Sequence, residues 1–459
     1  MQVHSATGSF YVLVAAVFFL YWACAGVRVL RLGIILAANY LFCAHFGLFY
    51  VVLLPVCGTV DYLLGLGLMR FERSWLRRVL VGASVVMNLG LLVGGRHMGW
   101  FLGSRWDWIF PLGLSFYAFQ SLTYTIDLYR RDGEGTKSLL TYLSAAAFFP
   151  TLEAGPITRV SEIVKQLAAR PSLRREDGGR AFFLIGMGIL KKALIADFLA
   201  ENLVNRVFDT PTLYSGAETL IAVYAFSLQL YFDFSGYTDI ARGAALLLGV
   251  RLPLNFDRPY QSQNLPEFWR RWHITFSNWL RDYLFFSLPG KRSAVMPYLN
   301  LVITMTLGGL WHGLGWTFFV WGLLHGLGLA VTRAWQARKR GAATARGRGK
   351  TSPLAVFATY QFVCLTWIFF RASSLSNALE ILARIGSLTV GFENIAPTLA
   401  LVMLIGVAAM LARKQWYEAA MERFAACPFY IHAAAITAVA LTVHRLGGRG
   451  NVPFVYSRF

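Results

Sequence analysis

The sequence predicts an all-α integral membrane protein, a bundle of many membrane-spanning helices. The chain of 459 residues is 56% hydrophobic and only 14% charged, and its mean hydropathy is +0.51. Soluble domains carry about 25% charged residues, and their interiors are too small to bury this much apolar surface. The composition therefore excludes a soluble enzyme, a disordered protein and a coiled coil. Because open sheet edges cannot persist in lipid, the spans must be helices.

Long runs without Asp, Glu, Lys or Arg define the candidate spans, since about 20 apolar residues are needed to cross the hydrocarbon. These runs cover residues 2–27, 32–60, 79–95, 108–126, 293–332, 351–370, 395–412 and 424–443. The run 293–332 is long enough for two spans joined by a tight turn. Three shorter runs fit partial, tilted or re-entrant helices: 138–152, 181–190 and 219–232. We expect about ten to twelve membrane segments in all.

We expect these segments to form one polytopic membrane domain over residues 1–459. No Lys or Arg precedes the first apolar run, so it does not fit a cleaved signal peptide, and we expect it to be retained. The expected parts are N-terminal helices over about 1–100, a core over about 101–332, a basic loop over 333–350 and C-terminal helices over 351–459.

Basic residues between the apolar runs predict the orientation of the chain in the membrane. The net charge is +20, from 43 Lys and Arg against 23 Asp and Glu. The segment 333–350 has several basic residues, no acidic one and many Gly and Ala, which indicates a flexible cytoplasmic loop. Topology and attraction to anionic lipid explain it most simply, and docking of an acidic cytoplasmic partner is the alternative. The charge is mostly a topology signal, so we expect no nucleic-acid partner.

The sequence has no motif for a metal site or a nucleophile. The 5 cysteines are scattered through apolar runs without CxxC or zinc spacing, which is typical of small buried side chains. Walker, HExxH and GxSxG motifs are absent from the sequence. We therefore predict no bound metal and no bound cofactor.

His312 lies in a glycine-rich segment, 307–316, near the middle of the run 293–332. Each of its glycines lowers helix stability by roughly 1 kcal/mol relative to Ala, so we expect a break there. Broken backbone at membrane depth is tolerated only inside protein or along a cavity. A neutral imidazole on such a cavity can take a proton from a hydroxyl near pH 7. A core histidine bonded to a neighbouring carbonyl fits the pattern equally well.

His273 lies in a Trp- and Arg-rich segment, residues 267–283. Pro266 and Glu267 suit a helix start. We therefore expect an amphipathic helix, too polar to span, at the membrane interface. It either anchors the surface or dips inward and presents His273 to a reaction chamber. The apolar positions that indicate one helical face are Phe268, Trp272, Phe276, Trp279 and Tyr283.

Several charges lie in apolar surroundings, where an unpaired charge is costly. Asp239 and Arg242 are spaced to pair on one helix face. We expect a structural role for such pairing. The other charges of this kind are Lys191, Lys192, Asp197 and Asp233.

Five blocks of the chain match one family in order. They are 111–130, 148–157, 231–256, 268–273 and 308–326. With these blocks, which include Phe268-Trp-Arg-Arg-Trp-His273 and Gly308-Gly-Leu-Trp-His-Gly313, the chain resembles the membrane-bound O-acyltransferase family. The similarity is to its bacterial polysaccharide branch of alginate O-acetylation and D-alanyl transfer proteins. The ending 453–459 is similar to the aromatic tail of the alginate proteins.

The resemblance implies a multi-span fold with a tunnel or funnel, which the acyl donor enters from the cytoplasm and the acceptor from outside. It implies catalytic roles for His312, at the family's near-invariant histidine, and for His273, at the second histidine of this branch. His325 also matches, and we interpret it as structural or tunnel-lining. The other residues expected to bind substrate or line the tunnel are Trp311, Trp272, Arg271, Asn255 and Asp233.

The function implied is transfer of an acyl group, with acetyl expected, from acetyl-CoA or an acyl-carrier thioester to a periplasmic or extracellular polysaccharide such as alginate. His312 acts as general base in this hypothesis, with direct transfer. An acetyltransferase partner beyond the bacterial inner membrane, the lipid bilayer and the polysaccharide are the expected partners. Two alternatives stay open: D-alanyl transfer to a cell-wall polymer, and a transporter or flippase. The segment 283–292 departs from the alginate pattern and leaves the polymer open.

Overall fold

The computed structural model describes residues 8–44, 47–102, 112–290, 293–342 and 352–446, and within these ranges every regular element is a helix. The all-α fold class is therefore confirmed. The chain divides into two compact units, which are described separately. The first unit is 1–189, 237–253 and 420–437, and the second is 190–236, 254–419 and 438–459.

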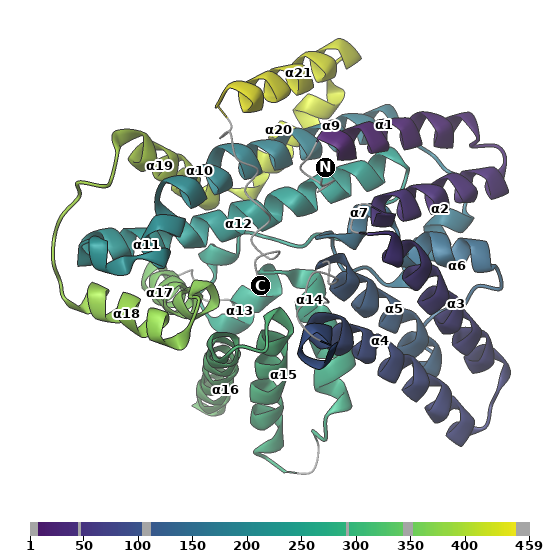
Figure 1. Cartoon of the computed structure of the whole chain (residues 1–459), viewed down its shortest axis with the longest axis horizontal. Coiled ribbons are helices and arrows are strands. Elements are labelled where there is room, and N and C mark those ends of the chain that lie inside the picture. The colour runs from purple at the N-terminus through teal and green to yellow at the C-terminus, as the bar shows by residue number, and fades with distance from the viewer. Residues whose placement is uncertain (1–7, 45–46, 103–111, 291–292, 343–351, 447–459) are drawn as a thin grey trace. The chain divides into compact units, whose positions relative to one another are not determined.

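The first unit is built mainly from the N-terminal helices, of which α1 and α2 run side by side (Figure 1). Its helices are α1 Gly8–Ala23, α2 Arg28–Ala44, α3 Leu48–Arg70, α4 Ser74–Leu102, α5 Leu112–Arg130, α6 Leu139–Ala146, α7 Phe149–Leu152, α8 Val160–Ala168 and α9 Arg175–Leu190. The long helix α12, Gly216–Leu247, contributes its last part.

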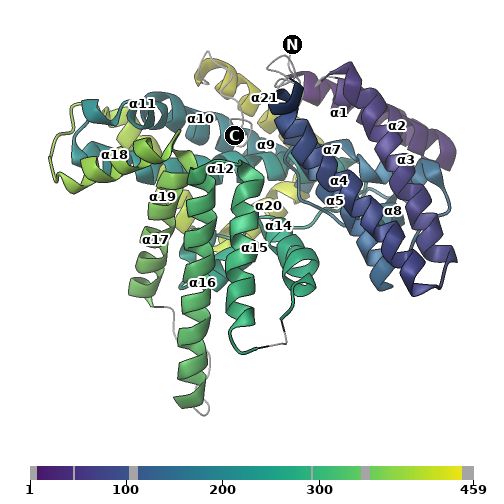
Figure 2. The same ribbon diagram turned by 60° about the horizontal axis from the view of Figure 1, so that its bottom comes forward.

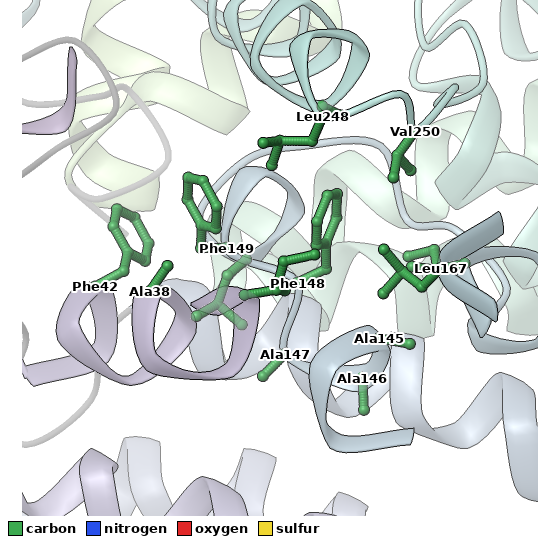
Figure 3. Close-up of a cluster of buried hydrophobic side chains, with 14 of the residues drawn as sticks. Ala38, Phe42, Ala145, Ala146, Ala147, Phe148, Phe149, Leu167, Leu248 and Val250 are labelled. Carbon is green, nitrogen blue, oxygen red and sulfur yellow. The ribbon is translucent and has the colours of Figure 1, made fainter. Parts of the chain in front are cut away.

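Aromatic rings, alanines and branched apolar side chains pack together in the core of the first unit (Figure 3). Phe42 of α2 lies 6.4 Å from Phe149 of α7 between ring centroids. Ala145, Ala146 and Ala147 are buried beside them and let the backbones come close. Polar contacts reinforce this packing, because the buried Asn39 accepts from the Phe149 N–H at 2.9 Å and donates to the Ser144 carbonyl at 3.1 Å.

Two buried acidic side chains join segments of the first unit. Asp61 of α3 accepts hydrogen bonds from Ser84 and Asn88 of α4, at 2.6 and 2.9 Å, and from Ser121 of α5 at 2.6 Å. Both carboxylate oxygens are thereby hydrogen-bonded inside apolar surroundings.

Asp177, at the start of α9, is the second of these acidic side chains. Its carboxylate forms ion pairs with Arg174 at 3.2 Å, Arg180 at 3.0 Å and Arg251 at 3.1 Å. Partial burial raises the pKa of Asp177, but the hydrogen bonds and charges of the three guanidinium groups outweigh it and hold the pKa below its usual range.

The second unit contains several short or π-helical segments. Its elements are η2 Lys191–Ala196, α10 Asp197–Leu199, η3 Ala200–Val204, α11 Asn205–Asp209, η4 Pro211–Leu213, the first part of α12, η5 Pro259–Gln261, α13 Leu265–Arg271, α14 Ile274–Trp279, η6 Leu280–Leu284 and η7 Phe285–Ser287. Then come α15 Met296–His312, α16 Trp316–Ala342, α17 Pro353–Arg371, α18 Leu375–Gly386, α19 Pro397–Leu411, α20 Lys414–Ala426 and α21 Phe429–Leu446. Helices α20 and α21 each belong to both units: residues 420–437 are part of the first unit, and the residues before and after them are part of the second.

The turn predicted within the run 293–332 is confirmed, because α15 and α16 form an antiparallel hairpin (Figure 2). Of these two helices, α16 is a candidate span, whereas α15 with its 17 residues is not. Glycines allow the two backbones to touch. A Cβ on Gly309 would lie 2.4 Å from the Phe318 carbonyl oxygen, and one on Gly322 would lie 2.5 Å from that of Met305. Further along, a Cβ on Gly326 would lie 2.7 Å from the Val302 Cα. Small residues at helix contacts are typical of membrane bundles.

The expected number of membrane segments is too high for the described residues, which hold 4 helices long and apolar enough to span, or up to 5 with a bent pair. The spans are 49–70, 74–92, 316–338 and 353–371, and the pair is α19 with α20, bent by 93°. Other apolar runs form shorter helices, such as α1 with 16 residues. A charge-free run gives the length of an apolar stretch but does not show where the helix within it ends.

The expected pairing of charges is confirmed. Arg242 lies 3.5 Å from Asp239 on α12. In the second unit the Lys192 ammonium lies 2.6 Å from Asp197 and 2.9 Å from Asp233. All 5 cysteines are free thiols. Residues 333–342 of the segment expected to be a basic loop belong instead to helix α16. The rest of that segment, 343–350, and the aromatic tail 453–459 lie outside the described residues.

We predict that Gly322→Ala destabilises the hairpin by about 1–3 kcal/mol, because the added methyl group meets backbone that cannot rotate away. The measurement is the thermal unfolding midpoint of the detergent-purified protein. Gly33→Ala is the matched control, since a Cβ on Gly33 in α2 meets nothing within 4 Å. Equal midpoints for both variants would contradict the close contact.

The depressed pKa of Asp177 predicts a pH dependence of stability. Its ion pairs stabilise the folded protein fully above the unfolded carboxyl pKa of about 3.9, and this contribution is lost as pH falls through the lower folded value. Asp177→Asn should therefore unfold at a lower temperature than wild type near neutral pH, with a gap that closes below about pH 4. Glu176→Gln, at the exposed neighbouring position, is the control. A gap for Asp177→Asn that stays constant across this range contradicts the assignment.

Candidate active site

His312 is the last residue of α15, at the break that the glycines predict. The helix ends there because the backbone of Gly313 is extended, and α16 starts at Trp316. The imidazole is buried among aromatic rings from four helices, α14, α15, α16 and α17. Its ring centroid lies 4.6 Å from that of Trp311, 4.9 Å from Phe370, 5.4 Å from Trp321, and 6.2 Å from both Phe318 and Phe276.

His273 lies at a second break, so the prediction of one helix over 267–283 is wrong. The start is close to the prediction, because Asn264 caps α13 by accepting from the Glu267 N–H at 2.9 Å. However, α13 ends at Arg271, and α14 starts at Ile274. His273 between them has a left-handed backbone with φ of +40°, which costs energy for a residue with a Cβ.

Asn255 stabilises this break. Its Oδ1 accepts hydrogen bonds from the Thr275 N–H at 3.2 Å and the Thr275 hydroxyl at 3.0 Å. The Asn255 carbonyl accepts from the Ile274 N–H at 2.9 Å. One buried side chain and its own backbone thereby satisfy the groups that the interrupted helix leaves exposed.

The same contacts select the tautomer of His273. Its Nδ1 lies 3.1 Å from the Asn255 Oδ1. Because the Thr275 N–H can only donate, it identifies that Asn255 atom as the oxygen, and the His273 Nδ1 must carry the hydrogen. In the neutral ring, Nε2 is then the basic nitrogen.

Two aromatic rings connect the histidines. Phe276 lies 5.0 Å from His273 and 6.2 Å from His312 between ring centroids. Trp311 lies 6.5 Å from His273 and 4.6 Å from His312, and it packs on Phe276 at 4.5 Å. The structure thus brings together the two histidines that the sequence singles out, around shared aromatic neighbours.

His325 is held at both nitrogens. The Trp269 indole donates to its Nδ1 at 3.3 Å, so its Nε2 carries the hydrogen and donates to the Thr366 hydroxyl at 2.9 Å. Thr366 in turn donates to the Val363 carbonyl at 2.8 Å. This arrangement joins α13, α16 and α17 and favours the structural interpretation of His325.

The other predicted site residues have different surroundings. Trp272 is buried in the aromatic core, 5.6 Å from Phe268 and 5.1 Å from Trp367 between centroids. Arg271 forms an ion pair with Glu267 at 2.7 Å. Asp233, whose chain neighbour Phe234 contacts His273 at 4.7 Å, forms the ion pair with Lys192 described above.

Several residues of the site do not emerge from the sequence. Phe370 and Thr366 lie on α17, outside the matched blocks, and their apolar run has no distinguishing motif. Asn300 and Thr304 of α15 are also buried, in a row of every fourth residue that ends at His312 and turns about 40° around the helix at each step. Their spacing of four residues, continued through Gly308 to His312, is a helical signal that could have found them.

The fold and the site together define a class of protein. It is a polytopic α-helical protein with two buried histidines at helix breaks. The sequence model of the membrane-bound O-acyltransferase family matches residues 105–374. This match covers more than half of the chain, which therefore belongs to that family. Among the described residues, no group of three or more His, Cys, Asp or Glu side chains could hold a metal ion.

Similar proteins include bacterial acetylases. The chain is 41% identical over 282 residues to the probable alginate O-acetylase of Azotobacter vinelandii, covering 61% of this chain and 54% of that protein. It is 33% identical over 391 residues to the peptidoglycan O-acetyltransferase of Helicobacter pylori, covering 77% and 73%. The teichoic acid D-alanyltransferase of Bacillus subtilis is 27% identical over 273 residues, covering 56% and 68%. The matched region thus spans about half the length of the alginate acetylase of Azotobacter vinelandii.

We predict that Asn255→Leu lowers the free energy of unfolding by about 1–3 kcal/mol, because the Thr275 N–H and hydroxyl lose their acceptor in a buried place. The shift of the unfolding midpoint measures the effect. The matched control is Asn202→Leu, at an exposed asparagine whose side chain donates to the Phe198 carbonyl. A smaller loss for Asn255→Leu than for the control would contradict the assigned role.

Proposed function

We propose that the protein transfers an acyl group from a thioester donor to an acceptor hydroxyl, with His312 as the general base. The observation that supports this proposal most directly is the burial of His312 at the tip of the α15–α16 hairpin, within an aromatic enclosure. An imidazole there is shielded from bulk water, where the thioester would otherwise be hydrolysed. General-base catalysis of this kind contributes about 10²–10⁴-fold.

His273 serves the reaction through its defined tautomer. The hydrogen bond of Nδ1 to Asn255 makes Nε2 a hydrogen-bond acceptor. Such a nitrogen can accept the hydrogen of the acceptor hydroxyl or of a donor amide, and so orient it relative to His312. In the mechanism, the His312 imidazole removes the hydroxyl proton while the oxygen attacks the thioester carbonyl. The carbon–sulfur bond then breaks, and the thiolate leaves with a proton returned from the imidazolium.

Acetyl is the acyl group that the relatives favour. The acetylases of alginate and peptidoglycan are 33% to 41% identical to the chain, against 27% for the D-alanyltransferase. We place the enzyme in the bacterial inner membrane with the donor, acetyl-CoA or an acyl carrier, on the cytoplasmic side. The acceptor is a polysaccharide beyond the membrane, reached directly or through a partner acetyltransferase.

We predict that His312→Ala reduces transfer of labelled acetyl from acetyl-CoA to the membrane-associated polymer by about 10²–10⁴-fold, because the general base is lost. The measurement uses membranes of cells with matched protein abundance. His444→Ala, at an exposed histidine near the end of α21, is the control and should retain wild-type transfer.

The same membranes are tested with a labelled D-alanyl carrier protein. Incorporation of D-alanine instead of acetyl, lost in His312→Ala, overturns the choice of acyl group but keeps the class of reaction. Wild-type incorporation by His312→Ala overturns the role of His312. Passage of an intact substrate across the membrane without thioester cleavage supports a transporter instead.

A further inference from the structure

Asp61 is an ionisable side chain at membrane depth without a charged partner. It is fully buried and lies near the middle of the candidate span 49–70. Within the described part of the chain, its contacts are hydrogen bonds from neutral groups, and no Lys, Arg or His pairs with it. A lone carboxylate in such a place is costly, and an ionisable residue inside a membrane marks a candidate functional site.

The hydrogen bonds around Asp61 are those of an ionised carboxylate. Ser84 and Ser121 each donate their hydroxyl hydrogen to it at 2.6 Å. The Ser84 oxygen must then accept from the Thr125 hydroxyl, which lies 2.8 Å away. In the same way, the Ser121 oxygen accepts from the Tyr142 hydroxyl at 3.2 Å. The hydrogens of the cluster thus point toward Asp61, whose negative charge they stabilise but do not neutralise.

Asn88 adds a buried oxygen that has no partner. Its amide nitrogen donates to the Asp61 carboxylate at 2.9 Å and to the Ser84 carbonyl at 3.0 Å. Since that carbonyl can only accept, it fixes which end of the amide is the nitrogen. The Asn88 Oδ1, bonded to the same carbon as this nitrogen, is fully buried and accepts no hydrogen bond from the described residues. A free oxygen beside an uncompensated carboxylate is a position that favours a cation.

The cluster provides oxygens that suit a small cation. Hard cations take oxygen ligands at about 2.3–2.6 Å, so oxygens that lie 2.6 to 2.8 Å from one another can contact the same ion. Hydroxyl hydrogens can rotate and turn the lone pairs of their oxygens toward it. The helices α3, α4 and α5, which supply these groups, pack side by side (Figure 2). The ligands are Asp61 of α3, Ser84 and Asn88 of α4, and Ser121 and Thr125 of α5.

We propose that this cluster binds one Na⁺ ion between α3, α4 and α5. The charge of the cluster sets the valence, because a monovalent cation neutralises one carboxylate, whereas a divalent ion leaves an extra positive charge at membrane depth. The oxygen ligands are those of a hard cation. The motifs whose absence predicts no bound metal concern zinc and nucleotide sites, and a site of one carboxylate with hydroxyl and amide oxygens has no such motif. The ion joins three helices of the first unit and so stabilises it.

The test measures the thermal unfolding midpoint of the detergent-purified protein while NaCl replaces choline chloride at constant pH and ionic strength. We expect the midpoint to rise with Na⁺ concentration and to saturate, because an ion that binds only the folded protein stabilises it. Asp61→Asn removes the charge that pairs with the ion and should abolish this dependence. Asp177→Asn is the matched control and should retain the dependence, because Asp177 is already paired with arginines.

A second variant keeps the inference testable if Asp61→Asn does not fold. Thr125→Val preserves the shape of the side chain and removes one ligand oxygen. It should raise the dissociation constant for radiolabelled Na⁺ roughly 3- to 10-fold. Thr359→Val, in α17, is its matched control, because the Thr359 hydroxyl donates to the Ala355 carbonyl outside the cluster.

Several outcomes overturn the inference. A wild-type midpoint that is the same in NaCl and choline chloride excludes the ion, and one that responds only to pH, with the response lost in Asp61→Asn, assigns a proton to Asp61 instead. An equal Na⁺ response in Asp61→Asn and wild type places the ion elsewhere. Stronger stabilisation by Ca²⁺ than by Na⁺ contradicts the monovalent charge. These measurements do not use acyl transfer, so their result leaves the proposed function unchanged.

Discussion

The site depends on how the chain breaks its helices inside a membrane protein. Every interrupted helix exposes backbone groups that lipid cannot satisfy, so each break needs an internal partner. At His273 that partner is Asn255, which accepts from Thr275 at two positions and holds a left-handed residue in place. The hydrogen bonds that stabilise the break also set the tautomer of His273. The Asn255 side chain therefore contributes both to local stability and to the chemistry of the site.

The second break, at His312, depends on close packing of the backbone instead of hydrogen bonds. At the tip of the α15–α16 hairpin, Gly309 and Gly322 let the two backbones touch, and Gly313 ends the first helix directly after His312. Aromatic side chains then close around the imidazole. Since packed rings move less freely than solvent, this enclosure holds His312 in one orientation and lowers the local dielectric, which strengthens its polar interactions.

The sequence predicts the features that depend on residues close to one another along the chain. The glycines around His312 predict the hairpin, and the spacing of Asp239 and Arg242 predicts their ion pair. The continuous helix through His273 is predicted wrongly, because its apolar spacing is helical on both sides of the break. The decisive contact comes from Asn255, 18 residues earlier in the chain. Likewise, Thr366 reaches His325 across a separation of 41 residues, which no local pattern shows.

The hairpin also explains why one helix can serve structure and chemistry together. Its glycine face uses backbone contact with α16, which needs no polar side chain. A methyl group on Gly309 or Gly322 would meet the backbone of the facing helix, so the close approach depends on glycine at both positions. The same close packing fixes the end of α15, where His312 stands directly before the extended Gly313. The contact that stabilises the hairpin therefore also sets the position of the candidate base.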